Sequence, residues 1–552
     1  MPHSGRTPLL MVVGLLLLTG LVYAPTLGLG FVWDDNALVI DYGDVLADPA
    51  RLLASLTTDL WSAGDDHIVD SGYYRPLMLV SLAVDRLLFG LDAWGYHLHS
   101  VLWHLLSLVL LFSLLRKLLG DMPALMGAAL FALHPVHAEA VIWIAARNDL
   151  IAAALVLFVL VLLQPLRVGW LQLAAATALT AAAVLGKESA LLLPLMVLVL
   201  DRAQGYGLRW GPLLATGVGV GAALGLRAVS GVGAGELPLL ATAIFFVQKL
   251  PSLVVLHLSL LALPWPLSGA RSLEWMSVSV PVVLLGVGVL AGGATVTVRM
   301  KGAPRRFALA GVALALLGFA PALLPLATKG LVGERYLYLP MAGVSLWFAA
   351  AAASWPRPVR LAAVGAVLGG GTLINLRIPD WSDDLSLWTA AMQDTPNPYV
   401  FSGLGHTLNR DDGWGDRPRS AALFIAALEA TPPMLDACGA VITATLHSGQ
   451  PARAAAVAPW SLERGCPWDG DYTGRASVAQ AFAGDWAAAR ATLAAGAPDP
   501  RKRDLVVRAA LMRLDGDEEG YTALRATWPD GALLDAQVER LLRSHPDVPG
   551  PG

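Results

Sequence analysis

The sequence predicts an all-α, polytopic membrane protein that ends in a soluble helical domain. Of its 552 residues, 56% are hydrophobic and only 14% are charged, whereas soluble domains average about 25% charged residues. Apolar runs of about 17–25 residues, long enough to cross a bilayer, recur up to about residue 378 and then stop. We therefore expect a transmembrane domain over residues 1–378 and an extracytoplasmic domain over residues 379–552.

We expect eleven or twelve membrane spans, although several of the apolar runs are short. The first run could be a signal peptide, but its length and the many runs that follow favour a retained span. The region 240–263 is apolar, but a full crossing there would put the basic region 299–306 on the outer side. We therefore expect a re-entrant or interfacial helix pair broken at Pro251. The other expected spans lie near residues 9–28, 97–115, 123–138, 148–166, 170–186, 189–201, 211–228, 276–298, 307–326, 340–355 and 359–377.

The orientation follows from Lys and Arg in short loops, which concentrate on the cytoplasmic side of membrane proteins. These loops include Arg116-Lys117, Arg167 and the region 299–306, and all fall on one side of the expected spans. We therefore expect a multi-pass cell (inner) membrane protein with a cytoplasmic N-terminus and an extracytoplasmic C-terminal domain. A net charge of −4 without any basic block gives no case for nucleic acid binding.

The expected outer segments differ in character. Within the first outer loop, residues 29–96, amphipathic stretches such as PLMLVSLAVDRLLFGL predict helices that lie along the membrane surface. In the tail, Gly-Gln or Gly-Asp steps at 449, 484 and 516 recur 35 and then 32 residues apart, which favours degenerate tetratricopeptide-type (TPR-like) helix pairs over a plain bundle. Cys438 and Cys466 would lie in an oxidising compartment, where they could form a disulfide unless the helices hold them too far apart.

Five polar clusters are expected on the outer face of this domain, where ionisable groups beside lipid often mark a function. Each has a simpler explanation, such as helix capping, an interface histidine or a snorkelling cation. The HxxH pattern with a nearby acid is a poor metal signal, so no metal site is predicted and dependence on a divalent metal stays open. The clusters contain Asp34 and Asp35; Tyr73, Tyr74 and Arg75; His134, His137, Glu139, Arg147 and Asp149; Lys187 and Glu188; and Glu334, Arg335, Tyr336 and Tyr338.

Their convergence on one face favours chemistry over these simpler explanations. A carboxylate deprotonates an acceptor hydroxyl, while fixed cations hold a phosphate leaving group. We therefore expect the catalytic residues among Asp35, Asp34 and Glu139. The expected donor- and phosphate-binding residues are Lys187, Arg335, Arg147, His134, His137, Arg75 and Tyr338.

The motifs FVWDDNALVI, GYYRPL, WGYHLHSVLWHLL, ALHPVHAEAVIWIAARNDLIAA, GKESALLLP and GERYLYLP follow one another between residue 31 and about residue 340. In this order they resemble the transmembrane-and-tetratricopeptide O-mannosyltransferases (TMTC family) and their bacterial relatives, which belong to the GT-C superfamily. The resemblance implies a GT-C-type fold and an inverting transfer of a sugar, mannose or another hexose, from a polyprenyl-phosphate donor to a hydroxyl. It also implies that an acid of the first outer loop, Asp34 or Asp35, is the base. In an alternating pattern, Asp35 would share a face with Phe31 and Trp33, and Asp34 would share the opposite face with Val32. On this alternation we favour Asp35 as the base.

The tail departs from the eukaryotic family pattern, because its repeats are few and weak. The acceptor is therefore left as a protein or a glycan, which the TPR-like tail could recruit, and no tightly bound cofactor is expected. A lipid-linked glycan ligase or polymerase is the main alternative. A transporter or flippase with a binding tail and an inactive scaffold are the others, although transporters tend to carry polar groups at mid-membrane depth.

Overall fold

The computed structural model describes residues 6–62, 71–233, 239–276, 278–323, 326, 330–410, 415–499, 503–528 and 531–543, without the side chains of 6–9 and 239–246. The chain forms two compact units, Met1–Leu387 and Trp388–Gly552. The predicted all-α class is confirmed, since the described residues contain only two short strands. These are β1 (Arg271–Ser272) and β2 (Leu331–Val332), which pair antiparallel with Arg271 opposite Val332.

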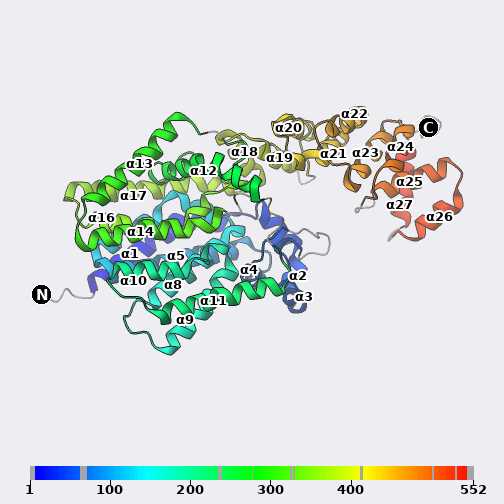
Figure 1. Ribbon diagram of the computed structural model, residues 1–552. Helices are drawn as coiled ribbons and strands as arrows, with labels where there is room; N and C mark the ends of the chain where they lie inside the picture. Colours follow the sequence, from blue (N-terminus) through cyan, green and yellow to red (C-terminus); the bar gives the residue numbers. More distant parts are fainter. Residues whose placement is uncertain are drawn as a thin grey trace. The chain divides into compact units, whose positions relative to one another are not determined.

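The first unit is a bundle of long helices joined by short ones (Figure 1). Each span expected from the apolar runs coincides with a helix. The long helices are α1 (Arg6–Tyr23), α5 (Ala93–Leu119), α6 (Asp121–Leu133), α8 (Arg147–Leu162), α9 (Trp170–Gly186), α10 (Leu193–Ala203), α11 (Trp210–Val229), α12 (Leu239–Ala262), α13 (Val280–Arg299), α14 (Gly302–Phe319), α16 (Tyr338–Ala352) and α17 (Arg357–Arg377).

Within the described chain, seven helices are long and apolar enough to cross a bilayer, or eight if the bent pair Asp121–Leu133 and Pro135–Ile142 is one span. This is fewer than the eleven or twelve expected. The difference comes from helices such as α9, α10 and α16, which have 17, 11 and 15 residues. At 1.5 Å per residue they are shorter than the roughly 30 Å of hydrocarbon. The polar turns at their ends occupy part of the length that a full span would need.

The expected break at Pro251 is wrong. Pro251 lies inside α12, which continues through it as one helix of 24 residues. Proline removes one backbone hydrogen bond, but helices in an apolar environment keep the remaining bonds and therefore tolerate it.

The stretch at residues 134–149, which carries one of the five expected polar clusters, is folded rather than an open loop. Three short helices, η4 (Pro135–His137), α7 (Ala138–Ile142) and η5 (Ile144–Ala146), turn this stretch back into the protein. Every residue from 131 to 150 is buried. The segment is therefore a buried, folded part of the first unit.

Small residues bring neighbouring helices into close contact. A Cβ atom on Gly343 of α16 would lie 2.4 Å from the Gly311 carbonyl oxygen and the Ala315 nitrogen of α14. Such a distance leaves room only for hydrogen, so α14 and α16 pack backbone against backbone. This is the way membrane helices associate where the hydrophobic effect gives no preference between protein and lipid.

The expected outer-loop helices are present before α5. Helices α2 (Gly43–Ala47) and α3 (Pro49–Ser55) precede α4 (Pro76–Phe89). One face of α4 is buried, including Met78 and Leu82, while Leu87 and Leu88 are exposed. This amphipathic pattern matches the one read from the sequence.

The second unit consists of consecutive helices, and three of its turns fall on the repeat read from the sequence. Gly449, Gly484 and Gly516 all have positive φ, at 75°, 80° and 74°, a backbone region that glycine enters without steric cost. Each glycine lies in the short turn between two consecutive helices. The helix α18 (Asp384–Asp394) begins in the first unit and ends in the second. The remaining helices of the second unit are α19 (Pro398–Leu408), α20 (Arg417–Glu429), α21 (Cys438–His447), α22 (Pro451–Leu462), α23 (Gly470–Phe482), α24 (Trp486–Ala495), α25 (Arg503–Leu514), α26 (Glu518–Ala526) and α27 (Gly531–Leu542).

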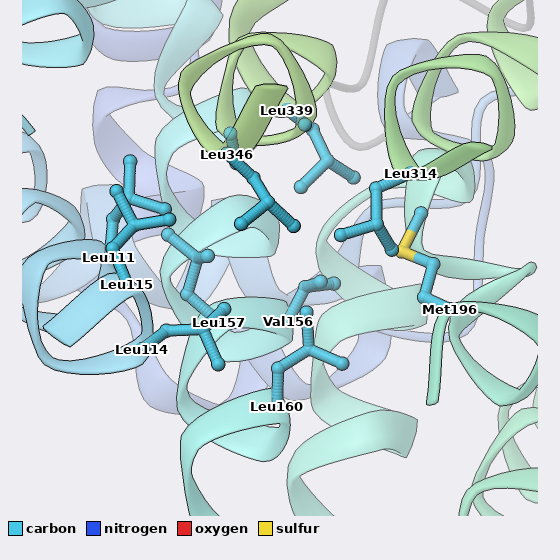
Figure 2. A pocket seen from close by; sticks show the side chains of 12 residues that line it. Leu111, Leu114, Leu115, Val156, Leu157, Leu160, Met196, Leu314, Leu339 and Leu346 are labelled. Atoms are coloured by element: carbon cyan, nitrogen blue, oxygen red, sulfur yellow. The ribbon is translucent and has the colours of Figure 1, made fainter. Parts of the chain in front are cut away.

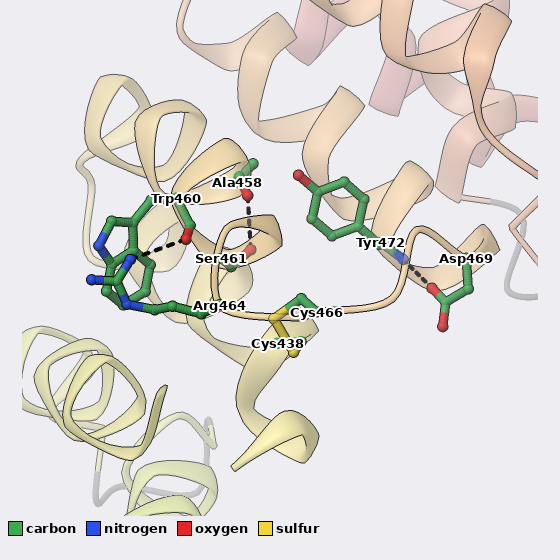
Figure 3. Close-up of a disulfide and its surroundings, with 8 residues drawn as sticks. All are labelled: Cys438, Ala458, Trp460, Ser461, Arg464, Cys466, Asp469 and Tyr472. Carbon is green, nitrogen blue, oxygen red and sulfur yellow. Dashed lines mark hydrogen bonds between the residues drawn. A yellow bond between two sulfur atoms is a disulfide. The ribbon is translucent and has the colours of Figure 1, made fainter. Parts of the chain in front are cut away.

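Cys438 and Cys466 form a disulfide in this second unit, with their Cα atoms 5.6 Å apart (Figure 3). The bond joins the start of α21 to the loop between α22 and α23. Of the two possibilities left open by the sequence, the structure has the bonded one.

Candidate active site

A sharp turn before the π-helix η2 (Asn36–Asp41) carries the two adjacent aspartates. Trp33 has φ 54° and is the only residue of the described chain, apart from glycines, with positive φ. The carboxylate of Asp35 is fully buried and accepts hydrogen bonds from the backbone N–H of Val32 (3.2 Å) and of Ala145 (2.7 Å). Asp35 therefore ties the turn to the segment before α8.

Asp34 differs from its neighbour. It is only partly buried, and its carboxylate accepts no hydrogen bond from any residue that the structure describes. Burial raises the pKa of Asp34 to about 6, and the positive charge of Arg335 acts in the opposite direction. Asp34 is thus a carboxyl group beside a cation with its oxygens available, which is what proton transfer to or from a bound hydroxyl requires.

Arg335 lies in η8 (Glu334–Leu337) and forms a buried ion pair with Glu139 of α7. Its backbone N–H also donates to Glu139, at 2.9 Å. The guanidinium lies 5.1 Å from the ring centre of Trp143 and 5.0 Å from that of Tyr336. These contacts on several sides hold the cation of Arg335 in one position.

Lys187, in the turn between α9 and η6 (Glu188–Ala190), is held in the same manner. Its Nζ donates to both carboxylate oxygens of Asp149, at 2.7 and 2.6 Å, and lies 5.0 Å from the Tyr336 ring centre. Burial lowers the pKa of Lys187, Asp149 raises it, and the positive charges of Arg75 and Arg335 lower it further. Lys187 therefore belongs to the same electrostatic cluster as Arg335.

Arg75 completes a set of three cations, of which Lys187 is buried and the two arginines are partly buried. It pairs with Glu188 at 3.0 Å and lies 4.6 Å from the Tyr73 ring centre. Burial alone would raise the pKa of Glu188, but Arg75 and then Lys187 lower it. The Arg75 Nε atom is buried and has no hydrogen-bond partner among the described residues, so one donor of this cation is available to a ligand.

The structure thus brings together Asp34, Glu139, Arg75, Lys187 and Arg335 from segments that are distant in the sequence. We call these five residues, with Asp149 and Glu188, the charged cluster. Three cation–carboxylate pairs surround two tyrosine rings, and Asp34 lies next to the Arg335 pair. Neither Lys187 nor Arg335 points into solvent, because their side chains are only 3% and 12% exposed.

Arg147 is not part of the charged cluster. Its fully buried guanidinium pairs with Asp85 and donates to the Tyr96 carbonyl oxygen at 2.6 Å and to the Ser100 hydroxyl at 3.2 Å. With its donors directed to α4 and α5, Arg147 holds helices together. The geometry does not support the predicted contact with a phosphate.

The two histidines and Tyr338 likewise lie elsewhere. His134 donates to the Leu261 carbonyl oxygen of α12 at 3.2 Å. His137 and Tyr338 pack against each other with ring centres 4.6 Å apart, and the Tyr338 hydroxyl contacts His104 at 2.8 Å. Their printed contacts are with one another and with neighbouring helices, and none is with Asp34.

Several contributors to the site were missed by sequence reasoning. Trp33 and Trp143 stack with ring centres 4.5 Å apart, next to Asp34 and Arg335. Asp384 accepts a hydrogen bond from the Trp33 backbone N–H at 2.6 Å. Arg271 forms a buried ion pair with Glu334. Paired aspartates in the WSDDLSLW stretch and an isolated arginine after the apolar run were the only signals available.

Two further features bear on possible ligands. The structure contains no group of three His, Cys, Asp or Glu residues, within its described part, that could hold a metal ion. An apolar cavity of about 10 Å³ lies among Leu111, Val156, Met196, Leu314 and Leu346 (Figure 2). It has the volume of about one water molecule and no polar lining, so it is a packing gap rather than a lipid site.

Comparison with known proteins agrees with the motifs. Residues 76–210 match a family model described as dolichyl-phosphate-mannose-protein mannosyltransferase. The chain is 35% identical over 196 residues to protein O-mannosyl-transferase Tmtc2 of Drosophila melanogaster, a match that covers 33% of this chain and 21% of that relative. It is 38% identical over 179 residues to Tmtc1 of the same organism, with 31% and 20% covered.

A third relative is human TMTC3, 29% identical over 207 residues, with 36% of this chain and 22% of that protein covered. The chain therefore spans only about a fifth of the length of these relatives. Among solved structures, ArnT from Cupriavidus metallidurans bound to undecaprenyl phosphate aligns with a TM-score of 0.38 and 17% identity, over 83% of this chain and 80% of that one. A TM-score this low does not establish a common fold. Over about a third of its length, this chain is similar in sequence to the TMTC proteins.

Proposed function

We propose that the chain is an integral membrane glycosyltransferase of the GT-C type. It transfers a sugar, mannose or another hexose, from a polyprenyl-phosphate carrier to a hydroxyl acceptor on the extracytoplasmic face, with inversion. The observation that carries this proposal is the carboxylate of Asp34, which bonds to no described residue and is influenced by Arg335, one of three neighbouring cations with Lys187 and Arg75. The names of the relatives, protein O-mannosyl-transferases, support the same activity.

In this reaction Asp34 is the base. Its carboxylate takes the proton of the acceptor hydroxyl as that oxygen attacks the anomeric carbon from the side opposite the phosphate. The bond between the anomeric carbon and the phosphate oxygen breaks, and the polyprenyl phosphate leaves with the electron pair. This assignment reverses the preference for Asp35, whose two oxygens are occupied by the backbone N–H groups of Val32 and Ala145.

Arg335, Lys187 and Arg75 stabilise the phosphate as its negative charge grows. Each cation is already paired with a carboxylate, which fixes its position before substrate arrives and reduces reorganisation during the reaction. The free Nε–H of Arg75 provides one additional charge-assisted hydrogen bond. Glu139 acts through Arg335 by holding its guanidinium and its backbone in place.

The extracytoplasmic placement of the C-terminal unit is supported by the Cys438–Cys466 bond, because disulfides persist in oxidising compartments.

The acceptor is a protein or a glycan, and the names of the relatives favour a protein. The helix pairs of the tail resemble TPR-like units in period and layout, and we propose that they recruit the acceptor. No tightly bound cofactor is needed for this chemistry, and dependence on a divalent metal is checked in the experiment below.

The test uses purified full-length protein with polyprenyl-phosphate [¹⁴C]mannose and a pool of synthetic Ser- and Thr-containing peptides. We expect label in peptide that is absent with Asp34→Asn, and unchanged transfer in the presence of EDTA. A parallel reaction with polyprenyl-diphosphate mannose separates this activity from a ligase. Consumption of the diphosphate donor alone, or full activity of Asp34→Asn, would overturn the proposal.

A further inference from the structure

We infer that Asp384, the first residue of α18, is a positioning residue that holds the Asp34 turn in its active conformation. The inference rests on the proposed role of Asp34 as the base. Asp384 lies within the first unit but is about 350 residues from the turn along the chain. The argument depends on the backbone of the turn and on its two carboxylate supports.

The turn is strained immediately before Asp34. Trp33 has φ 54°, a left-handed conformation in which the Cβ atom of an ordinary residue crowds its own backbone. A bulky residue adopts it only where surrounding contacts compensate, and such positions concentrate at functional sites. The strained residue directly precedes Asp34, so the position of the Asp34 carboxylate depends on this backbone conformation.

Asp384 supplies compensating contacts to two residues of the turn, Trp33 and Asn36. One of its oxygens accepts from the Trp33 backbone N–H at 2.6 Å, and the other accepts from the Asn36 side-chain amide at 3.1 Å. The same amide also donates to the Trp33 carbonyl oxygen at 3.3 Å. Asp384 is 6% exposed, so these bonds face little competition from water. Its carboxylate thus spans the residues on both sides of Asp34 and Asp35.

A second set of contacts supports the turn independently of Asp384. Asp35 accepts from Val32 and Ala145, and the Trp33 ring stacks on Trp143. Between these two supports, the Asp34 carboxylate is the one polar side chain of residues 34–36 that bonds to no described residue. Loss of Asp384 releases the Trp33 N–H and lets φ relax to negative values, which moves the Asp34 carboxylate away from the acceptor. The phosphate-binding cations lie on other elements and stay in place.

The experiment compares Asp384→Ala with Asp383→Ala in the full-length protein, using polyprenyl-phosphate [¹⁴C]mannose and the peptide pool. Asp383 is a matched control. It caps α18 by accepting from the Ser386 N–H at 2.8 Å and from the Ser382 hydroxyl at 3.2 Å, and it makes no hydrogen bond to residues 31–36. For Asp384→Ala we expect kcat to fall about 10- to 100-fold, the effect of a small displacement of a reacting group. The donor KM should stay within about twofold, because ground-state binding is retained. Asp383→Ala should keep kcat within about twofold of the wild type.

Asp384→Asn tests the same idea if the alanine variant does not fold. It keeps one oxygen for the Trp33 N–H but places an amide against that of Asn36, so its kcat should lie between those of the wild type and the alanine variant. An unchanged kcat in both Asp384 variants, or equal losses in Asp383→Ala and Asp384→Ala, would overturn the inference. Failure of the proposed function gives a different result, because the wild type would then show no transfer or Asp34→Asn would remain active.

Discussion

Asp34 and Asp35 are neighbours in the chain, but their carboxyl groups have different surroundings. Burial raises the pKa of Asp35 well above its ordinary value, and the N–H groups of Val32 and Ala145 partly offset this effect. Asp34 keeps part of its surface exposed and has no such donors. The structural role therefore falls to Asp35, and the residue suited to exchange a proton with a ligand is Asp34.

The raised pKa of Asp34 predicts how transfer depends on pH. A base must be deprotonated, so the rate should fall tenfold per unit as pH drops below about 6, where Asp34 takes up a proton. A pH profile of kcat/KM for the purified protein measures this limb. An acid limb near pH 4 would mean that the base is a carboxyl group with an ordinary pKa.

Thermal stability provides an independent check on the same group. The folded state binds the Asp34 proton more tightly than the unfolded chain does, since the pKa rises from 3.8 to about 6. Its ionisation therefore destabilises the fold as pH increases through that interval, by at most about 3 kcal/mol at neutral pH. Asp34→Asn should raise the Tm at pH 7.5 and leave it unchanged at pH 4, as measured by differential scanning fluorimetry in detergent.

The buried pairs of the charged cluster make single substitutions hard to interpret. A role in phosphate binding alone would predict that Lys187→Ala lowers activity without affecting folding. However, Asp149 would then be a buried carboxylate without its partner, which costs about 3–5 kcal/mol. We now predict that Lys187→Met lowers both the Tm and activity, whereas Lys187→Met with Asp149→Asn recovers the Tm but not transfer. Recovered transfer in the double variant would exclude Lys187 from phosphate binding.

Among the secondary-structure elements, short helices carry several of the candidate site residues, which in soluble enzymes often lie on loops. η4, α7 and η5 bend the chain so that Glu139 and Trp143 reach Arg335, and η8 carries Arg335 to meet them. Helical turns satisfy their own backbone hydrogen bonds, which is necessary where no water is present. The segments that carry the charged cluster are therefore short and helical.

In the tail, the disulfide closes a loop 28 residues long between α21 and the segment before α23. Closing a loop of this length restricts the unfolded chain and is worth about 3–4 kcal/mol in the entropic account. Cys438→Ser with Cys466→Ser should lower the midpoint of tail unfolding and leave donor consumption by the first unit unchanged. The unfolding of the tail, followed by limited proteolysis against denaturant, measures the effect, and an unaltered midpoint would contradict it.

For the molecule as a whole, the side of the membrane on which each unit lies is the main prediction. Lys and Arg in short loops predict that the region around Lys301 is cytoplasmic and the C-terminal unit is outside. Alkaline phosphatase fused after residue 400 should be active, and the same enzyme fused after Lys301 should be inactive. The opposite pattern would place the tail in the cytoplasm, where the disulfide and the extracytoplasmic reaction could not be maintained.

Composition and periodicity were sufficient to predict the helices and the glycine turns of the tail. These features depend on residues close together in the chain, such as an apolar run or a glycine that adopts positive φ. The same local view also identified the polar motifs, because charged residues are rare beside lipid.

Tertiary structure alone decided which of those polar residues meet. Glu139 pairs with Arg335 196 residues away, and Trp33 donates to Asp384 across 351 residues. Arg147 and His134 have the same residue types as the site, but their donors are taken by Asp85 and by the Leu261 carbonyl oxygen. A buried charge or donor binds whichever partner packing brings within reach, because leaving it unpaired costs too much free energy. No pattern along the chain predicts these partners. The proposal of Asp34 rather than Asp35 as the base therefore depends on the hydrogen bonds of the folded molecule.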